Sequence, residues 1–153
     1  MSRILGLCSG DPTSRLSFSG SARQLFISLD GLGVLSEAVD VDLTRPMRLA
    51  TRALELARSR RAPAHRLRAR WSARAVELRS RRAIRSLARS EADAVLMYGT
   101  DYFPAEQGVR PARPVGAALD ATFAQIARAG EHDFGQLTPL EVEACVARQR
   151  DIL

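Results

Sequence analysis

The sequence predicts an α/β fold in which helices flank a Rossmann-like parallel sheet. Short apolar segments rich in Val, Leu and Ala alternate along the chain with stretches of helical periodicity. This alternation is typical of a parallel sheet with helical crossovers. The apolar fraction is 46% over 153 residues, which is enough for a single domain with its own core, even if that domain is incomplete.

A first βαβ unit is predicted at the amino terminus. Residues 3–8 form an apolar run typical of a buried parallel strand. Ser, Gly, Asp and Pro dominate residues 9–19, which indicates a loop. Ser19 or Ser21 can cap the helix that follows, and a pair of glycines ends it. Residues 34–41 then form a second strand, and we expect the crossover between the two strands to be right-handed.

The rest of the chain alternates in the same way. Apolar residues at helical spacing, such as Val76, Ile84 and Leu87, mark the longest predicted helix. The remaining predicted elements are, in order, helices over 46–59 and 66–90, strands over 94–98 and 115–119, and helices over 121–129 and 139–151.

Charge is distributed unevenly. All 23 basic residues are Arg, and the net charge is +6. Residues 45–89 hold 15 Arg and only two acids, Glu55 and Glu77, which gives a local net charge of +13. Such a block can bind an anionic membrane surface or nucleic acid. A solvated helix surface explains it as well, and the single aromatic residue of the block, Trp71, argues against single-stranded nucleic acid.

Cysteine and histidine usage predicts no metal site. Cys8 is expected to be a small buried residue of the first strand, and Cys145 has no metal-ligating spacing to it. His65 and His132 also lack partners at such spacing. The apolar run over 3–8 is too short for a signal peptide, and no run approaches the ~18 apolar residues of a membrane helix. We therefore expect a cytoplasmic protein, with the Arg-rich helices as a candidate contact with the inner membrane face.

Small and polar residues follow the predicted strands, at the edge of a parallel sheet where ligands bind. Asp120 comes directly after the last apolar strand, where it can act as a general base or accept a hydrogen bond from a hydroxyl. A helix N-cap explains Asp120 as well. Glycines in the loop after the first strand let backbone N–H groups approach a ligand, although an ordinary surface loop also fits. The candidate binding residues are Gly10, Ser19, Gly20, Ser21, Thr100, Asp101 and Thr122.

Three segments carry a resemblance to a known family. They are Phe18-Ser19-Gly20-Ser21, Tyr98-Gly99-Thr100 and Leu119-Asp120-Ala121-Thr122-Phe123, with the helical Arg-rich insert at about 45–90 between the first two. Their order resembles the amino-terminal half of GT-B-type glycosyltransferases of the bacterial group 1, or family 4-like, kind. In that group a Ser-Gly loop follows the first strand and an Asp-x-Thr-Phe turn follows a later one.

The resemblance implies a function and a domain organisation. Residues 1–153 would form the acceptor-side domain, without the carboxyl-terminal nucleotide-sugar domain, so a truncated enzyme or a subunit is expected, inactive alone. The reaction would move a hexose from a nucleoside-diphosphate sugar to a hydroxyl acceptor, with Asp120 as the catalytic residue. The resemblance implies no metal and no other cofactor, because helix dipoles and basic side chains hold the diphosphate.

Two other functions remain open from the sequence. One is a non-catalytic Arg-rich module that binds nucleic acid or an anionic membrane. The other is a Rossmann-like domain with a purely structural role.

Overall fold

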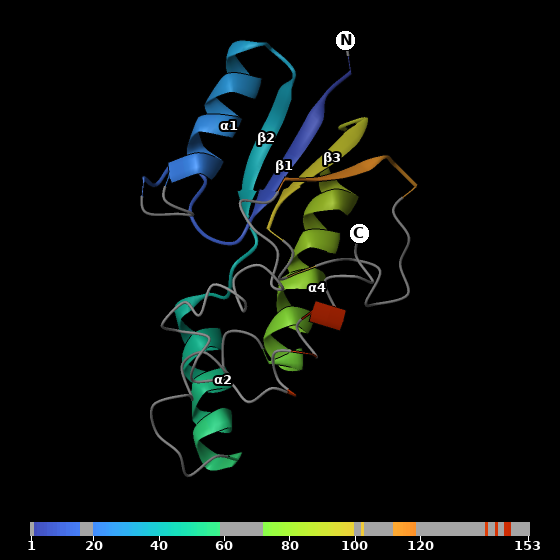
Figure 1. Cartoon of the computed structure of the whole chain (residues 1–153). Coiled ribbons are helices and arrows are strands. Elements are labelled where there is room, and N and C mark those ends of the chain that lie inside the picture. Colours follow the sequence, from blue (N-terminus) through green and yellow to red (C-terminus); the bar gives the residue numbers. More distant parts are fainter. Residues whose placement is uncertain are drawn as a thin grey trace. The chain divides into compact units, whose positions relative to one another are not determined.

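The computed structural model describes residues 2–15, 20–58, 72–99, 102, 112–118, 140, 143, 146 and 147. The chain divides into two compact units (Figure 1). The first contains residues 1–42 and 79–119, and the second contains residues 43–78 and 120–153. The helix α4 (Ala73–Arg89) contributes to both units.

The first unit is built on a four-stranded sheet, and every strand pair in it is parallel. The strands lie in the order β2-β1-β3-β4, so the first strand in sequence is an inner one. Their bounds are Ile4–Cys8 for β1, Leu35–Asp40 for β2, Ala94–Tyr98 for β3 and Val115–Ala118 for β4. This confirms the predicted α/β class and all four predicted strands.

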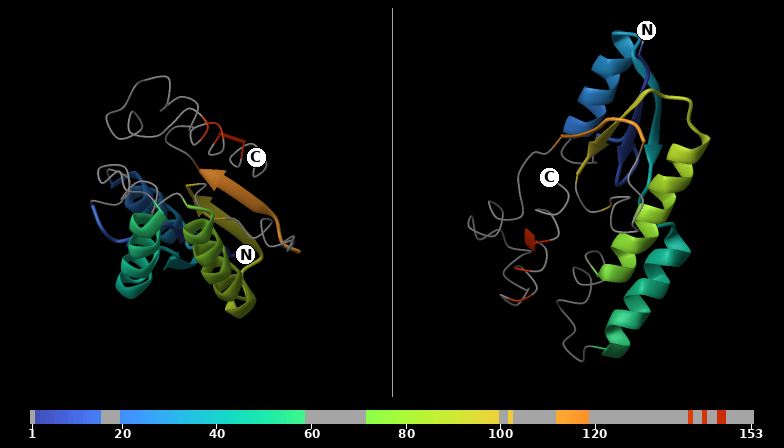
Figure 2. Two further views of the ribbon diagram at one scale, coloured as in Figure 1. Left: turned by 90° about the horizontal axis from the view of Figure 1, so that it is seen from below. Right: turned by 90° about the vertical axis from the view of Figure 1, so that its right-hand side faces the viewer.

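β1 lies between β2 and β3, and the chain reaches these two neighbours by crossing the sheet in opposite directions. The chain passes from β1 through α1 (Ser21–Gly31) to β2 on one side, and later enters β3 on the other side after α4. Right-handed crossovers in opposite directions place their helices on opposite faces of a sheet. The right-hand view of Figure 2 shows α1 and the last turns of α4 on either side of the strands.

The α1 face of the sheet is packed around Phe26. Its ring lies directly over Gly6 of β1, so close that a Cβ at Gly6 would be 2.5 Å from Phe26 Cε1. Cys8, Ala22 and Tyr98 complete this buried cluster. The prediction that Cys8 is a small buried strand residue is confirmed.

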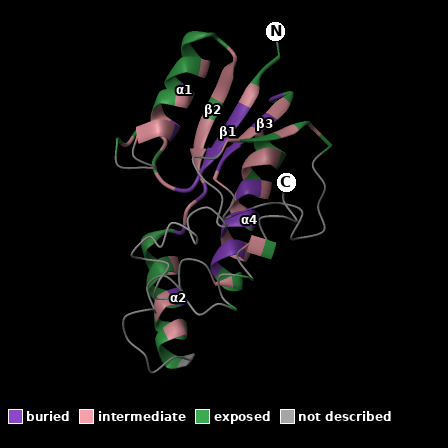
Figure 3. Cartoon of the chain, viewed as in Figure 1, coloured by how far each residue is buried: buried purple, intermediate pink, exposed green. Residues whose placement is uncertain are grey.

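The opposite face is formed by the alternate residues of the two inner strands. Leu5 pairs in register with Val95, and Leu7 with Met97, and all four side chains are buried. Figure 3 shows β1 as buried along most of its length. At the amino-terminal ends of the strands, the Arg3 N–H donates to Asp93 Oδ2 at 2.8 Å, which fixes β3 beside β1.

The ends of α1 differ in how well the sequence predicted them. The helix ends as predicted: Gly33 adopts a φ of 67° and donates its N–H to the Asp30 carbonyl at 2.8 Å. The predicted serine cap at its start is wrong. The N-cap is Gly20, with a φ of 85° and no side chain that could accept a hydrogen bond.

The second unit contains α2 (Arg45–Arg58) and the first residues of α4. Of the helix predicted over 66–90, the structure describes α4, which begins at Ala73. Residues 66–71 lie outside the described residues. The Ser72 hydroxyl accepts a hydrogen bond from the Ala75 N–H at 3.2 Å and caps α4.

Two further predicted helices are described in part or not at all. Within the helix predicted over 139–151, the described residues are helical; they are Leu140, Glu143, Val146 and Ala147. The helix predicted over 121–129 lies outside the described residues. In the part of the chain that the structure describes, no helix combines the length and apolarity needed to cross a bilayer.

Candidate functional site

The candidate site lies where the carboxyl ends of β1 and β3 meet. These strands are neighbours, but the chain leaves β1 toward one side of the sheet and leaves β3 toward the other. At such a switch point the two outgoing loops diverge, and ligands of open α/β sheets bind in the crevice between them. The topology therefore predicts a ligand site between Ser9 and Gly10, which follow β1, and Gly99, which follows β3.

Asp40, at the end of β2, fixes the loop that leaves β1. Its Oδ1 atom accepts hydrogen bonds from the Gly10 N–H at 2.9 Å and from the Asp42 N–H at 2.7 Å. Gly10 has a φ of 117°, a conformation that side-chain-bearing residues rarely adopt. Gly10 thus shapes the loop and directs its N–H to protein, so a contact between Gly10 and a ligand stays a prediction.

The amino terminus of α1 reaches the same edge of the sheet. A Cβ at Gly20 would lie 3.3 Å from the Arg15 carbonyl oxygen, so this backbone approach favours glycine. The first turn contains no acidic residue, and the Gly20 N-cap offers no side-chain acceptor. The first N–H groups of a helix are unsatisfied within it, and they attract anions and electronegative oxygens.

Ser21 and Tyr98 join the helix to the end of β3. The Tyr98 hydroxyl donates to Ser21 Oγ over 2.6 Å, across 77 residues of sequence. Tyr98 is 4% exposed and packs in the cluster beneath α1. The pair therefore holds the first turn of α1 beside the switch point.

Ser9 carries a polar atom that the protein does not satisfy. The residue is 6% exposed, and among the described residues its hydroxyl has no hydrogen-bond partner. A buried hydroxyl without a partner costs free energy of about 1–3 kcal/mol. Such groups call for a specific explanation, and a bound ligand or water at the switch point is one.

Tyr102 is a residue of this edge that sequence reasoning missed. It is fully buried, and its hydroxyl donates to the Leu7 carbonyl at 2.7 Å, with the Tyr98 carbonyl at 3.2 Å. It thus ties the loop after β3 to the backbone of both inner strands. A lone tyrosine within a Gly- and Pro-rich loop gives no periodic signal from which this role could be predicted.

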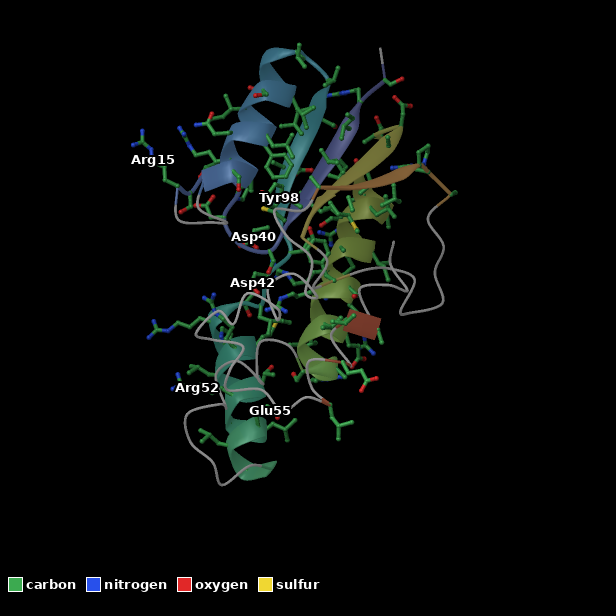
Figure 4. All side chains as sticks on the ribbon, in the orientation of Figure 1. Arg15, Asp40, Asp42, Arg52, Glu55 and Tyr98 are labelled. Carbon is green, nitrogen blue, oxygen red and sulfur yellow. The ribbon has the colours of Figure 1, made fainter. Side chains whose placement is uncertain are left out.

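Two arginines of the basic block over residues 45–89 donate hydrogen bonds to residues at and just after the end of β2. Arg79 is 2% exposed and its Nε donates to Asp42 Oδ1 at 2.9 Å. The Arg82 guanidinium donates to the Asp40 carbonyl at 3.0 Å. Figure 4 shows Asp40 and Asp42 at the end of β2, with Tyr98 at the end of β3. These contacts stabilise the outgoing end of β2 and, through Asp40, the Gly10 loop.

Farther along the loop, Asp11 organises a tight turn. Its Oδ1 accepts hydrogen bonds from the Thr13 hydroxyl at 2.7 Å and from the Thr13 N–H at 2.8 Å. The hydroxyl bond is the main cause that lowers the pKa of Asp11 below its ordinary value. The Asp11 carboxylate therefore holds the loop in this turn. Because its pKa is lowered, it stays charged to a lower pH than an ordinary aspartate.

The predicted site residues divide into two groups. The structure places Gly10, Gly20 and Ser21 together at the carboxyl edge of the sheet. The others lie outside the described residues; they are Ser19, Thr100, Asp101, Asp120 and Thr122. Among the residues that are described, no three His, Cys, Asp or Glu side chains are grouped so as to hold a metal ion.

Comparison of this chain with family models, with curated proteins and with solved structures found no match.

Proposed function

We propose that this chain supplies the acceptor-binding half of a glycosyltransferase that moves a sugar from a nucleoside-diphosphate sugar to a hydroxyl group. The observation that carries the proposal is the set of hydroxyl groups at the β1/β3 switch point. Ser9, Ser21 and Tyr98 all belong to this edge, and the Ser9 hydroxyl has no partner among the described residues. Neutral hydroxyls that can both donate and accept suit a polyhydroxylated acceptor better than a charged one.

In this proposal the protein positions the acceptor rather than activating the sugar nucleotide. The first turn of α1, which has no side-chain cap, places backbone N–H groups at this edge, and the Ser9 hydroxyl, unpartnered within the described part of the chain, can both donate to and accept from the acceptor. Asp120 would accept a hydrogen bond from the attacking hydroxyl. That oxygen then bonds to the anomeric carbon, the bond from this carbon to the diphosphate breaks, and the hydroxyl proton passes to the Asp120 carboxylate.

Titration of the isotope-labelled chain with a panel of hexosides, inositol and glycerol, followed by amide NMR, tests the proposal. We expect millimolar binding, with the largest shifts at the amides of Gly10, Ser21 and Gly99. The amides near Gly33, at the opposite edge of the sheet, should not move. A nucleoside-diphosphate sugar should bind weakly or not at all, because the ordering cost of binding it is not offset without its own domain.

Matched serine variants of α1 make this test specific. Ser21→Ala removes the hydroxyl bonded to Tyr98, whereas Ser28→Ala removes an exposed hydroxyl on the same helix that bonds only locally, to the Gln24 carbonyl at 2.9 Å. We expect the first variant to weaken acceptor binding and the second to leave it unchanged. Submicromolar affinity for a sugar nucleotide, or acceptor shifts confined to the amino-terminal edge, would overturn the proposal.

A further inference from the structure

The outer face of α2 is apolar, although this helix lies in the most basic part of the sequence. Leu49, Leu54 and Leu56 are 58%, 42% and 45% exposed. From residue 49 to residue 57, every exposed residue is Leu or Ala; the alanines are Ala50, Ala53 and Ala57. Figure 3 shows α2 as mostly exposed.

Within residues 49–57 of α2, the polar residues are the less exposed ones. Thr51 is 4% exposed and its hydroxyl donates to the Met47 carbonyl at 2.8 Å, while Arg52 and Glu55 are half-buried. Figure 4 shows Arg52 and Glu55 on this helix. A surface helix of a globular protein ordinarily has the reverse arrangement, with apolar residues inward and charged residues outward. Among the described residues, this arrangement leaves three leucines of one helix exposed.

Exposed positive charge lies beside these leucines. Arg45 and Arg48 are exposed, and Leu49 follows Arg45 by four residues, so the two share one side of the helix. The helix presents no exposed acidic residue. Basic residues that border an apolar helical face are typical of helices that lie in the interface of an anionic membrane.

We propose that α2 docks the protein on an anionic lipid surface. The helix lies in the plane of the membrane, Leu49, Leu54 and Leu56 enter the boundary between headgroups and acyl chains, and Arg45 and Arg48 contact the lipid phosphates. This proposal does not rest on sugar transfer.

A lipid surface explains both features of α2, whereas nucleic acid explains only one. Binding to a nucleic-acid backbone is driven by charge neutralisation and needs no exposed leucine. Single strands also need aromatic stacking platforms, and α2 contains no aromatic residue. A second copy of this chain could also cover the leucines, but it would give no role to the exposed positive charge of Arg45 and Arg48.

Vesicle flotation of the full chain tests the proposal, with vesicles of phosphatidylcholine and phosphatidylglycerol in equal parts. We expect binding to these vesicles and little binding to pure phosphatidylcholine. The double variant Leu49→Ala/Leu56→Ala should lower the partition coefficient about 50-fold, if half of the removed methylene-sized groups are buried in lipid. Arg45→Gln/Arg48→Gln should lower it about 30-fold, because each arginine near an anionic surface contributes about 1 kcal/mol.

A second pair of exposed apolar residues provides the control. Ile27 and Leu32, in and just after α1, are 48% and 67% exposed. Ile27→Ala/Leu32→Ala removes the same number of carbon atoms as the double variant of α2, and it should leave vesicle binding unchanged. Circular dichroism establishes that each variant retains its helix content, so a loss of binding is not a loss of folding.

Three results would overturn the proposal. One is vesicle binding that the α2 leucine variant does not weaken, or that the α1 control weakens equally. Another is binding to duplex DNA but not to vesicles, which would assign the basic block to nucleic acid. The third is a dimer, measured by light scattering, that the α2 leucine variant dissociates in the absence of lipid.

Discussion

Replacing Gly6 by alanine should destabilise the sheet unit through a single steric conflict. The added Cβ would lie 2.5 Å from Cε1 and 2.9 Å from Cδ1 of Phe26, whereas carbon atoms pack best at about 3.5–4.0 Å. Phe26 is 3% exposed and enclosed by the α1 cluster, so its ring has no open space into which to move. Overpacking of this kind costs about 1–3 kcal/mol.

Thermal and urea unfolding of the variant measure this cost. For a chain of this length a loss of about 2 kcal/mol lowers the Tm by roughly 4–8 °C. The urea midpoint should fall without a change in slope. Adding Phe26→Leu to the Gly6→Ala variant should recover part of the loss, and the double-mutant cycle should show a favourable coupling of about 1 kcal/mol.

Gly116→Ala is the matched control, because it also introduces a methyl group into a strand. The nearest atom to the added Cβ would be Leu96 Cδ1 at 3.6 Å, an ordinary contact, and Gly116 is exposed. This variant should be neutral or slightly stabilising, since it restricts the unfolded chain. If Gly6→Ala proves as stable as Gly116→Ala, or if Phe26→Leu brings no recovery, the Phe26 ring does not pack against Gly6 in the folded protein.

Three further variants test the Arg79–Asp42 ion pair, the Asp11 turn and the proposed role of Asp120. Asp42→Ala leaves the buried Arg79 guanidinium without this partner and should cost about 3 kcal/mol in urea unfolding; a loss under about 1 kcal/mol would contradict the buried ion pair. Thr13→Val should raise the pKa of Asp11 toward its ordinary value in a carboxyl NMR titration. An unchanged pKa would contradict the hydrogen bond from the Thr13 hydroxyl to Asp11. Because the pKa of Asp11 is lowered on folding, the stabilisation it provides is complete above the ordinary carboxyl pKa and is lost as the pH falls through the lowered one. In an enzyme reconstituted with a nucleotide-sugar domain, Asp120→Asn should lower turnover by about 10²–10⁴ and barely change the Tm; near-normal turnover would remove Asp120 from the site.

The strands and their direction could be predicted from sequence because each is a short apolar run bounded by polar loops. The start of α1 could not, because a glycine at the N-cap is chosen by the close approach of the Arg15 backbone, which is a tertiary contact. The cap of α4 could not be predicted either, because helical periodicity continues through Ser72 and gives no sign that its hydroxyl accepts a hydrogen bond from the Ala75 N–H.

The candidate site was predictable only where local chemistry signals it. The glycines and the serine after β1 predict a loop and a helix start. The structure places Gly10, Gly20 and Ser21 at the switch point. Tyr102 and the Arg79–Asp42 pair escaped prediction because their partners are 95 and 37 residues away in sequence. Similarly, periodicity predicted α2 as a helix but gave no indication that its leucines face outward.

The position of β1 between β2 and β3 has a consequence for the order of folding. Ile4 pairs with Leu35 on one side and with Ala94 on the other, so the second pairing closes a loop about three times longer. Tripling a loop adds about 1 kcal/mol of closure entropy, and β1, α1 and β2 can therefore associate first. Until β3 arrives, the apolar edge of β1 is open to pairing with another chain. We therefore expect aggregation during refolding, and any dependence on chaperones, to arise mainly after the first βαβ unit has formed and before β3 pairs with β1.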